Sequence, residues 1–192
     1  MAERVSEQQL TRDELMALRN KRTGMNIFQL SWIMVFVCLV VINYFIRTNF
    51  AAWPPEGVER MSAVLPTIVT VLLLVSVFTV RRAQKAIDTD SVAQFLTQWR
   101  ATLLLGVMFI IGMAVSWVSV NDAGQYGALA RVMVAYHAIH ALAIGAYMWI
   151  VDGRVRAGRI SSRDTWDVEA GAKLWYFVVI AWVLFYIPLY VI

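Results

Sequence analysis

Five stretches of the sequence contain no Lys, Arg, Asp or Glu, and each is 19 to 21 residues long. They cover residues 26–46, 61–80, 101–121, 132–151 and 174–192. About 20 apolar residues in a helix cross the hydrocarbon core of a bilayer, which is about 30 Å thick. Inside lipid a helix pairs its own backbone amides, and these stretches lack the alternation of polar and apolar residues that is typical of barrel strands. The pattern predicts an all-α, polytopic membrane bundle with five transmembrane helices.

The composition points to the same class of protein. Hydrophobic residues make up 60% of the chain, compared with about 45–50% in soluble proteins. Tryptophans lie near the ends of the charge-free stretches, where interfacial anchors are expected. These are Trp53, Trp99, Trp117, Trp149 and Trp175.

Basic residues are distributed unequally between the two sides of the predicted membrane. Fourteen of the 17 lie in the N-terminal segment and the second and fourth loops; the other three are Arg47, Arg60 and Arg131. The positive-inside rule therefore predicts a cytoplasmic N-terminus and, with five spans, an outside C-terminus. The net charge of +4 is then a consequence of topology, and it does not indicate nucleic-acid binding, which needs a basic face on a soluble domain.

Residues 1–25 are predicted to form a cytoplasmic leader before the membrane domain at 26–192. No apolar segment precedes residue 26, so we expect no cleavable signal peptide. Thr11 with Glu14 matches a capping box, which favours a short surface helix, although a simple tether fits the leader equally well. Ser91 with Gln94 forms a second such box and predicts that the third helix begins before the membrane.

Sequence motifs of soluble enzymes are absent: there is no P-loop, dinucleotide fingerprint or CxxC. The ionisable residues inside a predicted span are His137 and His140, which share one helix face. Ionisable groups in lipid are costly and raise a functional hypothesis. A closed metal site needs three or four ligands, and bis-histidine haem ligation needs two helices, whereas both histidines of the chain lie on one. We therefore expect no cofactor in this chain, and a neutral, hydrogen-bonded histidine pair.

Several short elements occur in the order and spacing of one membrane-protein family. They are Tyr44-Phe45-Ile46-Arg47 with Trp53-Pro54-Pro55, Leu65-Pro66 with Thr70, Leu105-Gly106 with Phe109, His137-Ala138-Ile139-His140 with Gly145, and Glu169-Ala170-Gly171-Ala172 with Trp175. Together they resemble subunit III of the haem-copper cytochrome c oxidases, in the short bacterial form with five spans. The resemblance runs from Ser31 to Ile192.

This resemblance implies an accessory subunit of a bacterial inner-membrane oxidase that is not itself catalytic. Such a subunit packs against oxidase subunits I and II, which hold the haem and copper, binds phospholipids and supports proton uptake. The positions implied for lipid binding or subunit packing are His137, His140, Trp53, Arg154, Arg159, Glu169 and Trp175. Among these, Arg154, Arg159 and Glu169 match loop positions near lipid head groups. The positive-inside rule accounts for the two arginines equally well.

Six buried polar positions of the family are replaced in this sequence. The replacements are Trp32, Val69, Met113, Ser116, Tyr176 and Val179, which stand where the family has Glu, Asn, Gln, Glu, His and Asp. Loss of both partners of a buried hydrogen bond can be nearly neutral, whereas loss of one is expensive. Joint replacement is therefore compatible with a stable fold, but it removes any role that depends on those carboxylates.

Two other functions remain open from the sequence. One is an accessory subunit of a quinol oxidase or a nitric oxide reductase, although the Trp-Pro-Pro loop favours the cytochrome c branch. The other is a small stand-alone transporter, which needs a polar path and usually has paired broken helices. The spans hold few polar groups, so the transporter ranks last.

Overall fold

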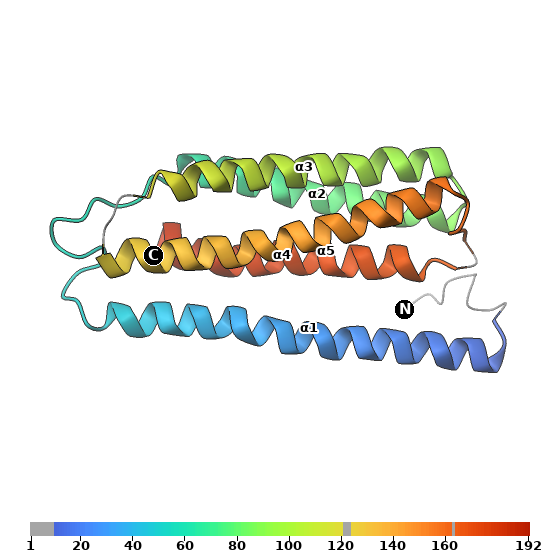
Figure 1. Ribbon diagram of the computed structural model, residues 1–192, viewed down its shortest axis with the longest axis horizontal. Helices are drawn as coiled ribbons and strands as arrows, with labels where there is room; N and C mark the ends of the chain where they lie inside the picture. The colour runs from blue at the N-terminus through green and yellow to red at the C-terminus, as the bar shows by residue number, and fades with distance from the viewer. Residues whose placement is uncertain (1–9, 121–123, 163) are drawn as a thin grey trace.

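The computed structural model describes residues 10–120, 124–162 and 164–192, and it is built from long helices that run antiparallel to their sequence neighbours (Figure 1). Apart from an isolated bridge between Ser161 and Asp164, no β-structure occurs in these ranges. The helices are α1 (Arg12–Arg47), α2 (Val64–Asp88), α3 (Val92–Val118), α4 (Gly124–Arg156) and α5 (Trp166–Tyr186), followed by the π-helix η2 (Ile187–Val191). Five helices are long and apolar enough to cross a membrane, which confirms the predicted all-α class.

Helices α2 to α5 form the centre of the bundle, and α1 lies along one side of it (Figure 1). Helix α2 packs on α3, α3 on α4, α4 on α5 and α5 on α2, whereas α1 packs chiefly on α5. The start of α1, the α2–α3 turn and the α4–α5 loop lie together at one end. We call this the basic end, because Arg22, Arg82, Arg100, Arg154 and Arg156 lie there. The C-terminus lies at the opposite end.

The helices extend beyond the charge-free stretches at the basic end. The first capping box is confirmed: the Thr11 backbone N–H donates to Oε2 of Glu14 at 2.8 Å, and the Glu14 N–H donates back to Oγ1 of Thr11 at 3.4 Å. The expected short, separate helix is wrong, because α1 continues from Arg12 to Arg47 without a break. Ser91 makes no capping hydrogen bond through its side chain, although α3 does begin before the predicted span. Apolar stretches mark only the part of a helix that would lie in lipid.

The core of the bundle is aromatic, and its tryptophans join neighbouring helices. Their indole N–H groups donate to the carbonyl of Met148 from Trp99 (2.9 Å), to Oγ of Ser76 from Trp175 (2.8 Å) and to Oγ1 of Thr70 from Trp182 (2.8 Å). A buried tryptophan needs such a partner for its polar edge. The prediction that Trp99 and Trp175 are interfacial anchors is therefore wrong, since both are buried.

Candidate functional site

His137 lies in the centre of the bundle, inside a cage of aromatic rings. The residue is 1% exposed. Ring centroids of Trp182, Phe109 and Phe36 lie 5.2, 5.6 and 6.2 Å from that of the imidazole. Among the described residues neither ring nitrogen has a hydrogen-bond partner. The expected hydrogen-bonded pair is thus not found at His137, which packs as an aromatic ring.

His140 lies nearer the surface of α4, where it contacts α1. Its Nδ1 is 2.6 Å from the carbonyl oxygen of Tyr136, one turn earlier in the same helix. The rings of Trp32 and Phe36 from α1 lie 4.6 and 5.2 Å from the imidazole. Trp32 in turn stacks on Phe177 of α5 at 5.6 Å. His140 is therefore part of the packing between α1, α4 and α5.

Replacing His137 with leucine tests whether the imidazole has a role beyond packing. A buried imidazole without a hydrogen-bond partner adds no polar stabilisation to the fold, and polar groups of the separated helices also find partners in the membrane. We expect the free energy of unfolding of the His137→Leu variant to stay within about 1 kcal/mol of the parent value. Thermal unfolding in detergent measures this change, with His140→Leu as the matched variant. A loss of more than twice that size would show that His137 has a polar partner in the folded protein.

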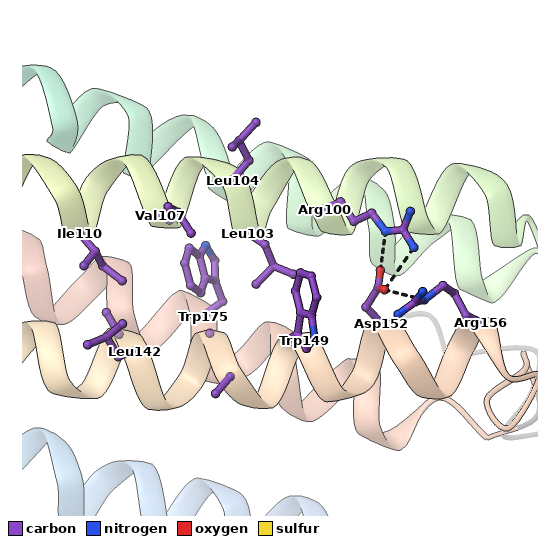
Figure 2. Close-up of a pocket in the computed structure, with 14 residues that line it drawn as sticks. Arg100, Leu103, Leu104, Val107, Ile110, Leu142, Trp149, Asp152, Arg156 and Trp175 are labelled. Atoms are coloured by element: carbon purple, nitrogen blue, oxygen red, sulfur yellow. Dashed lines mark hydrogen bonds and ion pairs between the residues drawn. The ribbon is translucent and has the colours of Figure 1, made fainter.

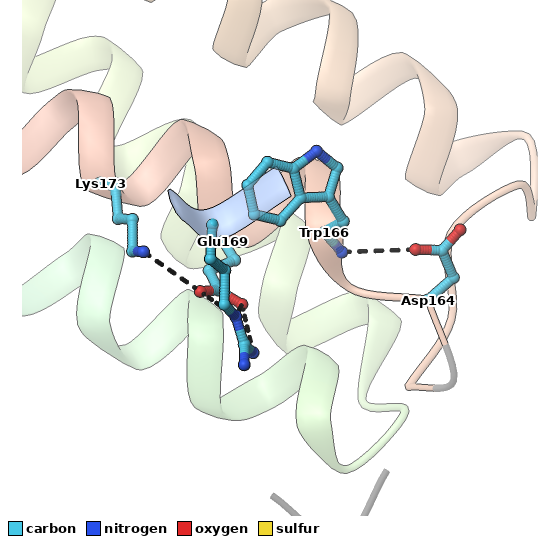
Figure 3. Close-up of polar contacts among 5 residues, drawn as sticks. Asp164, Trp166, Glu169 and Lys173 are labelled. Carbon is cyan, nitrogen blue, oxygen red and sulfur yellow. Dashed lines mark hydrogen bonds and ion pairs between the residues drawn. The ribbon is translucent and has the colours of Figure 1, made fainter. Parts of the chain in front are cut away.

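Glu169 lies in the first turn of α5 and is buried, so its predicted position in a loop is wrong. Arg22 of α1 binds its carboxylate with two nitrogens, Nη2 at 2.8 Å from Oε2 and Nε at 2.9 Å from Oε1. Lys173 lies one turn further along α5, with Nζ 3.5 Å from Oε1 (Figure 3). Two-point arginine–carboxylate pairs are strong and directional. This contact holds the basic end of α1 against α5.

The other residues predicted from the family pattern lie at opposite ends of the bundle. Arg154 lies in the last turn of α4, so its predicted position in a loop is also wrong. It is exposed, and its Nη1 is 2.6 Å from Oδ2 of Asp167, which ties α4 to the start of α5. Arg159 is exposed in the α4–α5 loop. Trp53 is half-buried in the α1–α2 loop, with its ring 5.2 Å from that of Tyr126 and 5.4 Å from the guanidinium of Arg47. The seven predicted residues thus do not meet in one site.

A groove between α3 and α4 contains residues that the sequence analysis missed (Figure 2). Its volume is about 740 Å³, and its floor is Trp175 of α5. At the basic end Asp152 is buried, with Oδ1 2.9 Å from Nε of Arg100 and Oδ2 3.0 Å from Nε of Arg156. The charge-free stretch ends at residue 151 and predicts a loop from Asp152 onward. Its spacing of four residues from Arg156, typical of a helical ion pair, is the signal that could have placed it on α4.

Metal ligands do not gather anywhere in the described ranges. No group of three His, Cys, Asp or Glu side chains there could hold a metal ion. The two carboxylates discussed above, Asp152 and Glu169, bind arginines.

Comparison with known proteins identifies the family. The family model described as cytochrome c oxidase subunit III matches residues 4–192. Proteins named cytochrome c oxidase subunit 3 from Synechocystis and Thermostichus vulcanus are each 24% identical to this chain, over 88% of it and over 74% and 86% of their own lengths. The protein of that name from Aedes aegypti is 29% identical over 72% of the chain and 54% of its own length. On the strength of the match across nearly all its residues, this chain belongs to the cytochrome c oxidase subunit III family.

Proposed function

We propose that this chain is the non-catalytic third subunit of a respiratory cytochrome c oxidase in a bacterial plasma membrane. The observation that supports this most directly is the family match over residues 4–192. In this proposal electrons pass through haem and copper in subunits I and II. The chain itself stabilises the catalytic subunit, binds phospholipids and supports proton uptake.

Helix α1 is the face that we propose for docking on the catalytic subunit. Of its residues, Phe36 and Asn43 are buried in the isolated chain, whereas large apolar side chains along the helix are exposed. The exposed ones include Leu30, Met34 and Val41. Apolar exposure alone also suits lipid, because helix association in membranes depends on packing and not on apolarity. A polar contact of α1 favours a protein partner. The Gln29 side-chain amide donates to the Lys173 carbonyl at 3.0 Å, which holds the helix and its exposed face in one orientation.

The buried carboxylates of this chain support a structural role. Asp152 and Glu169 are both held by arginines at the basic end. The family positions with carboxylates inside the membrane are Trp32, Ser116 and Val179 here. In this proposal the chain supports proton uptake through the way it positions its partner. It does not depend on a proton-carrying side chain at those three positions.

A pull-down of the tagged full chain in mild detergent tests the proposal. We expect larger subunits on the gel and a haem a signature in the reduced-minus-oxidised optical spectrum. Haem b or haem o without haem a would instead indicate a quinol oxidase or nitric oxide reductase. A colourless eluate that holds this chain alone, in two mild detergents, would contradict the subunit role and favour a stand-alone transporter.

The same experiment tests the docking face with two matched substitutions. Val41→Trp adds bulk to the outer face of α1 and should lower the yield of co-purifying haem severalfold, because shape complementarity is lost. Val132→Trp adds the same bulk to an exposed position of α4 and should leave the yield unchanged. Equal yields from both variants would show that the partner binds elsewhere on the bundle.

A further inference from the structure

The groove between α3 and α4 is apolar along its length and charged at one end. Leu104 and Val107 of α3 line one wall, Leu142 and Trp149 of α4 the other, and Trp175 the floor (Figure 2). Arg100, Asp152 and Arg156 close it at the basic end. The volume of about 740 Å³ lies within the range of about 300–1,000 Å³ typical of ligand sites. Of the seven residues implied for lipid binding or subunit packing, Trp175 alone lines the groove.

The length of the groove matches one leaflet of a membrane. It runs from Arg100 to Ile110 on α3 and from Arg156 to Ala141 on α4. The ten-residue rise along α3 is about 15 Å, which is half of the about 30 Å hydrocarbon core. Ile110 and Leu142 lie toward each other across the groove (Figure 2) and divide it from a second hollow nearer the opposite end. A transmembrane helix of a partner protein would need a continuous groove across both leaflets of the membrane.

Open space at a glycine gives the groove its depth. A Cβ added to Gly145 would find no heavy atom within 4 Å. A Cβ on Gly106, by contrast, would lie 2.4 Å from Cη2 of Trp175, so the ring of the floor reaches the backbone of α3. Trp149 at the rim is 64% exposed. The hollow therefore opens toward the surroundings of the bundle and could receive a flexible chain from the side.

The charged end has one more cation than anion. Asp152 is buried, whereas Arg100 and Arg156 are half-exposed on either side of it. In their contacts with Asp152, the arginines use Nε and Nη2 of Arg100 and Nε of Arg156. A guanidinium has five N–H donors, so both keep donors beyond those used on Asp152. The cluster thus has a net charge of +1 and suits a singly charged phosphodiester.

We propose that this groove binds an anionic phospholipid, with one acyl chain along α3 and α4 and its phosphate on Arg100 and Arg156. Arg156 and Arg154 are two positions apart on α4, so their side chains leave the helix about 200° apart. Arg154 pairs with Asp167 of α5, and the site therefore faces away from it. The inference rests on the proposed function, in which the chain binds phospholipids, and it takes the basic end to face the cytoplasm. Its occupant would come from the cytoplasmic leaflet, where basic residues meet anionic lipid.

Native mass spectrometry of the tagged full chain, with any subunits that accompany it, tests the site. Phosphatidylglycerol and phosphatidylcholine are added in turn, and the fraction of chain that retains one lipid is measured. We expect retention of phosphatidylglycerol to exceed that of phosphatidylcholine. Arg156→Gln and Arg100→Gln should each weaken retention of phosphatidylglycerol about fivefold. The exposed Arg82 at the basic end provides the control, and Arg82→Gln should change retention little.

A second pair of variants tests the acyl chain separately from the charge. Gly145→Leu fills the groove and should remove retention of both lipids, while Gly153→Leu, also in open space on α4 but outside the groove, should not. Thermal unfolding checks that each variant is folded. Unchanged retention in Gly145→Leu, or equal losses in the Arg82→Gln and Gly153→Leu controls, would overturn the proposal. If glycerol phosphate bound as tightly as the phospholipid, that result would also overturn the proposal. If no haem-bearing partner accompanies the chain while lipid retention is intact, the result would count against the subunit role and not against this site.

Discussion

Replacing Trp182 with alanine should lower the free energy of unfolding by about 3 kcal/mol, the largest effect expected of a single substitution in this chain. Trp182 is fully buried, its ring lies 5.1 Å from that of Phe109 and 5.2 Å from that of His137, and its N–H holds Thr70. The substitution leaves a cavity at the meeting point of α2, α3, α4 and α5. We place the loss at the low end of the range for buried tryptophans, because the separated helices remain in lipid and the transfer term is small.

Thermal unfolding in detergent, or unfolding by increasing fractions of a denaturing detergent, measures this loss. Trp149→Ala is the matched control, since Trp149 is the same residue type on α4 and is largely exposed. Its effect should stay within about 0.5 kcal/mol. If the two variants lost the same stability, the aromatic centre of the bundle would not be what holds α2 to α5 together.

The number of helices and their class could be predicted because lipid imposes one simple rule on the sequence. A span must exclude charge over its whole length, and this leaves a pattern that needs no knowledge of the neighbours. The ends of the helices could not be predicted in the same way. Beyond the lipid a helix may contain charge, and α1, α2 and α4 continue through Arg22, Arg81 and Arg154 without any apolar signal.

The site was less predictable because its contacts join residues far apart in the sequence. Arg22 and Glu169 are separated by 147 positions, and Arg100 and Asp152 by 52. The sequence pattern puts both carboxylates in loops, where a charge needs no buried partner. Once the helices are extended, each carboxylate turns inward and is buried, and a buried charge must be paired. The error in helix length thus led directly to the missed ion pairs.

Among the replaced polar positions of the family, Val69 and Met113 are accommodated by apolar packing, and Tyr176 by a hydrogen bond. Val69 of α2 fills the space at Gly112 of α3, where an added Cβ would lie 2.4 Å from Cγ1 of the valine. Met113 is buried, and the hydroxyl of Tyr176 donates to Oε1 of Gln84 at 2.8 Å. This pattern is consistent with joint replacement of hydrogen-bond partners, which the sequence alone suggested.

The attachment of α1 at the basic end depends on the ion pair between Arg22 and Glu169, and the rest of the helix depends on it less. Glu169 is buried, and Arg22 binds it with two nitrogens, whereas Lys173 approaches only to 3.5 Å. Removing one partner of a buried pair costs more than the pair itself contributes, because a charge is left behind. Since α1 packs mainly on α5, the loss should appear as local release of α1 before the other helices separate.

Arg22→Ala should therefore weaken the attachment of α1 by about 2 kcal/mol, below the full cost of about 3–5 kcal/mol for a deeply buried pair because Arg22 is partly exposed. Spin labels on α1 and α5 at the basic end, in a Cys38→Ser background, would report a broader and longer distance distribution. Arg19→Ala, at an exposed position one turn away, should leave the distribution unchanged. Adding Glu169→Gln to Arg22→Ala removes the buried charge that Arg22 no longer pairs and should restore part of the attachment. If the double variant released α1 further, the charge on Glu169 would be satisfied mainly by Lys173, and the arginine would act only through its packing.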